Sequence, residues 1–123
     1  MTSGLTQTCY LFFSTLANPT RLAILEALNN GPKSVGDIAR ELKQEQSMIS
    51  HNLKPLERCA FVFKQRKKKQ HIYSLNTETM KPMFKLFLFH SEKYCPSNGK
   101  CFSEKNLKKH RKKEASRKLH VTH

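Results

Sequence analysis

The segment from residue 46 to residue 58 carries polar side chains of the types that recognise nucleic acids. Its apolar residues Ile49, Leu53 and Leu56 step by four and three positions, the spacing of one face of a helix. The opposite face carries polar and basic residues, namely Gln46, Ser47, Ser50, His51, Lys54 and Arg58. Glutamine pairs with adenine through two hydrogen bonds, serine and histidine bind bases or phosphates, and lysine and arginine suit phosphates. Such a face predicts contact with the major groove of double-stranded DNA, with the helix N-terminus on base edges.

A pair of cysteines forms a second group that could do chemistry. Cys95 and Cys101 are separated by five residues, and Lys93 and Lys100 beside them favour the thiolate form. Thiolates bind soft metals and react with oxidants, but a five-residue spacer matches none of the common short zinc-knuckle spacings. The pair predicts either a soft-metal or redox effector site or two thiols in a flexible segment.

Positive charge exceeds negative charge by a wide margin. The chain has 23 Lys and Arg residues against 9 Asp and Glu residues, a net charge of +14. That imbalance predicts a polyanionic partner, most commonly a nucleic acid, although charge alone fits DNA, RNA and an anionic membrane equally. The segment from Lys100 onward predicts either a nonspecific DNA anchor or a solubilising appendage. A second concentration of charge is the basic run of Arg66, Lys67, Lys68 and Lys69.

Length and composition exclude several classes of protein. A chain of 123 residues is long enough for one domain. No apolar run approaches the roughly 18 residues of a membrane span, and the start lacks the pattern of a secretory signal, so we expect a cytoplasmic protein without membrane contact. The dispersed cysteines do not predict a disulfide framework, and Cys9 and Cys59 predict buried apolar residues. The sequence shows no recognisable catalytic arrangement, so we do not expect an enzyme.

Local signals predict the first two helices. Residues 5–16 are mostly apolar and lack glycine and proline, which predicts a helix. Asn18 followed by Pro19 is a typical start for the second helix, with asparagine as the N-cap and proline in the first position. Gly31 and the proline after it end this helix.

A helix-turn-helix unit is predicted next. Ser34 with Asp37 three positions later resembles a capping box, which predicts a short third helix over residues 34–42. A tight turn separates it from the fourth helix, residues 46–58. Two short helices joined in this way place the second one against DNA.

The remaining elements predict a hairpin and a long final helix. Residues 61–63 and 71–75 have the β-branched and aromatic content of strands, and the basic run lies between them as the hairpin tip. A last helix is predicted over residues 79–94, where Pro82 is tolerable only in the first turn. Apolar residues lie nearly all round this helix, so we expect a second copy of the chain to cover it.

These elements predict a mainly α fold with a small β-hairpin, a winged helix-turn-helix of about five helices plus a two-stranded wing. Residues 1–95 would form the DNA-binding and dimerisation domain, and residues 96–123 a basic, flexible tail. The wing, residues 64–71, would lie on the DNA backbone or in the minor groove.

Three segments resemble the arsenic-repressor (ArsR) type of regulator. Residues 16–25, LANPTRLAIL, resemble the family's opening LADPTRLRIL. Residues 46–56, QSMISHNLKPL, resemble its recognition helix QSTVSHHLKVL, and residues 71–75, HIYSL, resemble the xxYYSL strand that closes its wing. The segments fall in the family's order and spacing, and the resemblance covers roughly residues 9–95.

The resemblance implies a homodimer, joined mainly through its first and last helices, that represses genes until an effector binds. It also matches Gln46, Ser47, Ser50 and His51 to the family's DNA-contacting positions. The family's metal sites have few counterparts. Ser34 and Gly36 stand where the third-helix site needs cysteines, and only His90 survives among the last-helix positions Thr77, Thr79, His90 and Lys93. No metal site and no required cofactor are therefore predicted.

The sequence departs from the family pattern at three places. Pro55 lies inside the recognition helix, where it removes a hydrogen bond and is expected to bend the helix at a cost of about 3 kcal/mol. The basic run lacks the usual glycine, which predicts a looser hairpin tip. Cys59 and Ala60 replace the family's small residue and glycine at the end of the helix.

An alternative function is left open by the sequence. The lysine-rich wing and basic tail also fit an architectural or adaptor protein that binds nucleic acid without sequence preference.

Overall fold

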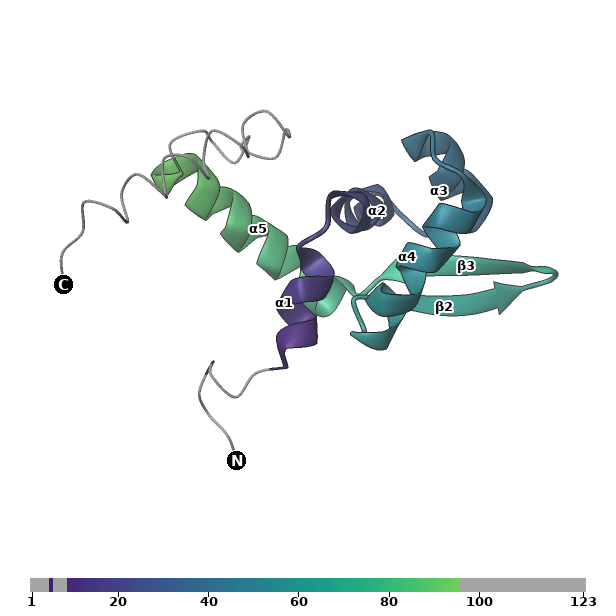
Figure 1. Cartoon of the computed structure of the whole chain (residues 1–123), viewed down its shortest axis with the longest axis horizontal. Coiled ribbons are helices and arrows are strands. Elements are labelled where there is room, and N and C mark those ends of the chain that lie inside the picture. The colour runs from purple at the N-terminus through teal and green to yellow at the C-terminus, as the bar shows by residue number, and fades with distance from the viewer. Residues whose placement is uncertain (1–4, 6–8, 96–123) are drawn as a thin grey trace, which may run out of the picture. The chain divides into compact units, whose positions relative to one another are not determined.

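The computed structural model describes Leu5 and residues 9–95 (Figure 1). Residue contacts divide the chain into two units, Met1–Pro82 and Met83–His123. The helices and strands follow in the order α1 (Tyr10–Leu16), α2 (Pro19–Asn29), β1 (Lys33–Ser34), α3 (Val35–Leu42), α4 (Gln46–Arg58), β2 (Val62–Lys67), β3 (Gln70–Leu75) and α5 (Thr77–Tyr94). None of the described helices has the length and apolar content needed to cross a membrane.

The predicted fold class is confirmed, with five helices and a small antiparallel sheet in the described residues. The core of the first unit draws on every helix from α2 to α4. Its side chains with 2% exposure or less are Ile24, Leu25, Leu28, Ile38, Ile49, Leu53, Leu56, Phe61, Val62 and Met80. Burial of these groups removes apolar surface from water and fixes the helices of the helix-turn-helix against one another.

The start of α2 is confirmed, whereas α1 is shorter than predicted. Asn18 is the N-cap of α2, its Oδ1 accepts a hydrogen bond of 3.0 Å from the backbone N–H of Arg21, and Pro19 is the first helical residue. Helix α1 begins at Tyr10 and not at residue 5, because Cys9 is extended, with φ −62° and ψ 117°. Cys9 is exposed, so the prediction that it is buried was wrong.

The sheet has a strand that the sequence did not predict, and its order is β1-β3-β2. The two residues of β1 pair antiparallel with β3, Lys33 opposite Tyr73. Strands β2 and β3 pair along their whole length, so Lys67 faces Gln70 and only two residues remain for the turn. The predictions that the tip holds the whole basic run and is loose were wrong. Lys68 closes the turn at a φ of 56°, a conformation that glycine adopts more easily.

Helix α5 begins at Thr77, two residues before the predicted start. Pro82 therefore lies in the second turn and not in the first, so that prediction was wrong. As proline has no N–H, the carbonyl of Glu78 loses its helical partner there.

Helix α4 ends in a Schellman motif that is built without glycine. The N–H of Phe61 donates to the carbonyl of Leu56 (2.9 Å), and the N–H of Ala60 donates to the carbonyl of Glu57 (3.0 Å). These two bonds require a left-handed residue between them, and Ala60 takes that role at a φ of 58°. Phe61 and Leu56, the two positions between which such a motif usually has an apolar contact, are both buried.

We expect the substitution Ala60→Gly to stabilise the protein. The left-handed conformation costs an L-residue about 1–2 kcal/mol, part of which is offset by the greater freedom of glycine in the unfolded chain, so the net gain is about 1 kcal/mol. Thermal unfolding followed by circular dichroism measures it as a rise in Tm. Ala17→Gly is the matched control, since Ala17 has an ordinary φ of −81° and glycine there should lower Tm. An equal change in Tm for Ala60→Gly and Ala17→Gly would contradict the role of Ala60 as the left-handed residue of the motif.

Candidate nucleic-acid interface

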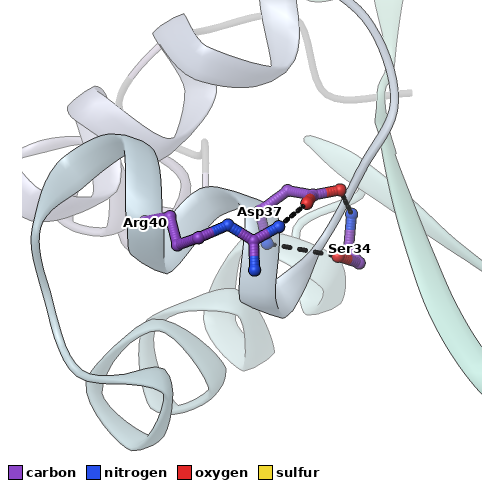
Figure 2. Close-up of polar contacts among 3 residues, drawn as sticks. All are labelled: Ser34, Asp37 and Arg40. Atoms are coloured by element: carbon purple, nitrogen blue, oxygen red, sulfur yellow. Dashed lines mark hydrogen bonds and ion pairs between the residues drawn. The ribbon is translucent and has the colours of Figure 1, made fainter.

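Helix α3, the first helix of the helix-turn-helix, is fixed at its start by the predicted capping box. The N–H of Asp37 donates to Ser34 Oγ (3.2 Å), and the N–H of Ser34 donates to Asp37 Oδ2 (3.5 Å). Figure 2 shows that Arg40, one turn further along, pairs with the other carboxylate oxygen of Asp37. Hydrogen bonds from Ser34, followed by the charge of Arg40, lower the pKa of the Asp37 carboxyl below its usual 3.8.

The turn between α3 and α4 reverses the chain through a left-handed residue. Lys43 has a φ of 55°, and the N–H of Gln44 donates to the carbonyl of Ala39 (3.0 Å). Three residues, 43–45, therefore separate the two helices. This tight connection is what sets the crossing of α4 over α3 in a helix-turn-helix.

Helix α4 runs from Gln46 to Arg58 and continues through Pro55. Its inner side chains Ile49, Leu53 and Leu56 have no exposed surface. The predicted polar face lies on the opposite side, where Ser47, His51, Lys54 and Arg58 follow one another at helical spacing and are all exposed. Gln46 and Ser50 form a neighbouring row, Gln46 exposed and Ser50 half-buried. We call these six residues the outer face of α4.

The amide of Gln46 lies over the first turn of α3. A methyl group added at Gly36 would lie 3.6 Å from Gln46 Nε2, an ordinary van der Waals distance. The Gln46 side chain therefore lies in van der Waals reach of position 36, at the start of α3.

A part-buried polar contact joins α4 to the start of α2. Arg21 Nε donates to Asn52 Oδ1 (3.1 Å), and Asn52 Nδ2 donates to the carbonyl of Met48 (2.9 Å). Asn52 is 8% exposed, and these two hydrogen bonds give both of its side-chain polar atoms a partner. Sequence reasoning missed this pair, because partners 31 positions apart leave no local signal.

The structure divides the basic run of the wing into two sets. Lys67, Lys68 and Lys69 together line a shallow depression at the hairpin tip with Gln70 and Ile72. Arg66 belongs to β2 and pairs with His71, on the opposite face of the hairpin from Lys67, because successive strand residues alternate.

An ion pair joins the base of the wing to α4. Lys64 Nζ lies 3.9 Å from Glu57 Oε1, and both side chains are more than a third exposed, so the pair contributes little stability. Burial, with a smaller effect from Glu57, raises the pKa of the Tyr73 hydroxyl above its usual 10.0. Lys54, Glu57 and Arg58 line a second shallow depression beside this junction.

Of the two cysteines in the predicted effector site, only Cys95 lies within the described residues. Cys95, just after α5, is half-buried, and Cys101 lies outside the described residues, as does the proposed tail from residue 96. The effector site therefore stays a prediction. Cys59 is half-buried, and its Sγ lies 3.5 Å from Thr15 Oγ1 of α1. The described part of the chain contains no group of three His, Cys, Asp or Glu side chains that could hold a metal.

Comparison with known proteins links this chain to a family of regulators. The family described as "Bacterial regulatory protein, arsR family" matches residues 18–64. The HTH-type transcriptional regulator NmtR of Mycobacterium tuberculosis is 38% identical over 77 residues, 63% of this chain and 64% of NmtR, so this chain spans slightly less than two thirds of NmtR. Transcriptional repressor SdpR of Bacillus subtilis is 35% identical over 68 residues, 55% of this chain and 76% of SdpR.

Solved structures agree with that likeness. The homodimeric winged helix-turn-helix DNA-binding domain of Mb0332 from Mycobacterium bovis matches with a TM-score of 0.64 and 26% identity, over 69% of this chain and 79% of that one. Reduced HlyU of Vibrio cholerae matches with a TM-score of 0.58 and 29% identity, over 70% of this chain and 87% of HlyU.

The capping box predicts how stability depends on pH. Because the folded pKa of Asp37 lies below its unfolded value, its contribution is complete above about pH 3.8 and is lost as the pH falls through the lowered pKa. We expect Asp37→Asn to lower Tm at pH 7 and the difference from wild type to shrink below pH 4. Glu26→Gln, at an exposed carboxylate of α2, is the control. A difference between wild type and Asp37→Asn that persists unchanged at pH 3 would contradict the ionic role of Asp37.

Proposed function

This chain belongs to the ArsR family of bacterial regulatory proteins, and from that premise we propose that it is a homodimeric repressor that binds a specific sequence in double-stranded DNA. Membership confirms the predicted family and the predicted class, a winged helix-turn-helix transcriptional regulator and not an enzyme. SdpR, one of its relatives, is itself named a transcriptional repressor.

The observation that carries the proposal is the division of α4 into two sides. Its inner side is buried in the core, while the residues of the outer face are exposed, apart from the half-buried Ser50. Short polar groups at the N-terminal end of a helix suit base edges, and Lys54 and Arg58 at the other end suit phosphates. The outer face thus offers base contacts and positioning contacts along one helix.

The wing supplies charge beside that helix. Lys67, Lys68 and Lys69 are exposed and gathered at the hairpin tip. Ammonium groups there gain from the dense phosphate charge of DNA whatever its sequence. We assign them to affinity, along the backbone or in the minor groove, and assign sequence recognition to α4.

Selection of bound DNA from a random pool tests the proposal. We expect the full chain to enrich a short sequence with twofold symmetry. If about six to ten phosphates are contacted, affinity should fall about 10³–10⁵-fold between 50 and 200 mM salt. Recovery of no preferred sequence, with the same salt dependence, would instead support the sequence-independent architectural function.

Substitution of the outer face tests which residues recognise bases. In the double variant Ser50→Ala and His51→Ala, affinity for the selected sequence should fall at least about tenfold, towards that for random DNA, since a good base contact contributes about 1–3 kcal/mol of discrimination. Fluorescence anisotropy with both DNAs measures the difference. Asn29→Ala, at an exposed end of α2, is the control. Unchanged discrimination in the double variant would remove α4 from base recognition.

Two helices leave apolar side chains exposed in the single chain, which supports a homodimer. On α1, Tyr10 and Leu11 are 78% and 62% exposed. On α5, four successive residues from Leu86 to Phe89 are each more than half exposed. An exposed apolar run of this kind indicates an interface with another protein. In the ArsR family the first and last helices form the dimer interface. The Mb0332 domain is described as homodimeric.

A charge introduced into the exposed apolar run of α5 should separate the protomers. Leu86→Asp would place an unpaired carboxylate in the interface, at a cost of about 3–5 kcal/mol, and so should weaken dimerisation at least about a hundredfold. Sedimentation velocity measures the association. Asn29→Asp adds the same charge on α2 as a control. If Leu86→Asp remains as dimeric as wild type, α5 is not the interface.

A further inference from the structure

One apolar side chain stands among the polar groups at the start of α4. Met48 is 46% exposed, although the buried residues of this helix, such as Ile49 and Leu53, are completely covered. It lies in the first turn, directly after Ser47 and three positions before His51, which makes His51 its neighbour on the helix surface. Met48 thus borders the outer face where base contacts are expected.

The backbone under Met48 is held more firmly than helical hydrogen bonding alone would hold it. Its carbonyl accepts a hydrogen bond of 2.9 Å from Asn52 Nδ2, and Asn52 is in turn bound by Arg21 of α2. A fixed backbone with a flexible thioether side chain suits close packing against a small apolar group.

We infer that Met48 recognises the methyl group of a thymine in the major groove. This inference rests on the proposed function. Thymine is the one DNA base that presents a methyl group in that groove, and apolar side chains contact it there. The N-terminal residues of such a helix lie against base edges, where an exposed methionine has only thymine as an apolar partner. Burial of the two apolar groups against each other removes both from water.

Deoxyuridine provides the test, because it lacks only the methyl group. In the sequence obtained by selection, each thymine is replaced in turn by deoxyuridine, and affinity is measured by fluorescence anisotropy. We expect one thymine in each half-site at which wild type loses about fourfold, the equivalent of one buried methyl group. Met48→Ser should bind the two DNAs equally well at that position, whereas Met48→Leu, which keeps the apolar surface, should still prefer thymine.

Thermal unfolding of each variant verifies that the exposed position 48 tolerates the change. An enriched sequence that wild type binds equally with thymine or deoxyuridine everywhere would overturn the inference alone and leave the proposed function standing. The same loss in Met48→Ser as in wild type would also overturn it. A pool in which nothing is enriched contradicts both the inference and the proposed function.

Discussion

The orientation of α4 depends on core packing together with a part-buried hydrogen bond between Arg21 and Asn52. Close packing of Leu53 and its neighbours in the core resists rotation of α4. The bond of 3.1 Å from Arg21 Nε to Asn52 Oδ1 adds to that resistance, since a rotation that broke it would leave the amide oxygen of Asn52, a residue with 8% exposure, without its partner, at a cost of about 1–3 kcal/mol. Arg21 is itself held at the start of α2, because its backbone N–H donates to the side chain of Asn18, the N-cap of that helix. The N-cap of α2 thus holds the backbone of the residue whose side chain binds α4.

The same constraint separates the roles of the residues on α4. With Asn52 directed inward, the helical period places Ser47 and His51 on the solvent side. Pro55 follows three positions after Asn52, and the main-chain hydrogen bond that it removes is the one that the carbonyl of His51 would accept. The turn that follows Pro55 is held at its end by the Schellman motif around Ala60.

Local chemistry explains which features the sequence predicted. The caps of α2 and α3 join residues three positions apart, so Asn18 and Ser34 were visible from their neighbours alone. Strand β1 and the Arg21–Asn52 bond depend on partners brought together only by the fold, and nothing near them in the chain indicates either. The tight hairpin tip was missed because pairing continued through charged residues that have low strand propensity. Met48 did leave a signal, since it is apolar and out of phase with the buried face.

Affinity and specificity fall on different elements for a physical reason. The wing lysines lie in and directly before a turn of two residues, where Lys68 bears an unfavourable φ, and their charges act over about 8–10 Å in physiological salt. A charge with that reach cannot distinguish one base from the next, 3.4 Å away along a strand. Discrimination between bases requires short-range contacts that are lost when one chemical group on a base changes. These contacts come from short side chains on a helix fixed by packing and by Asn52. The long basic side chains can stay mobile without loss, whereas α4 cannot.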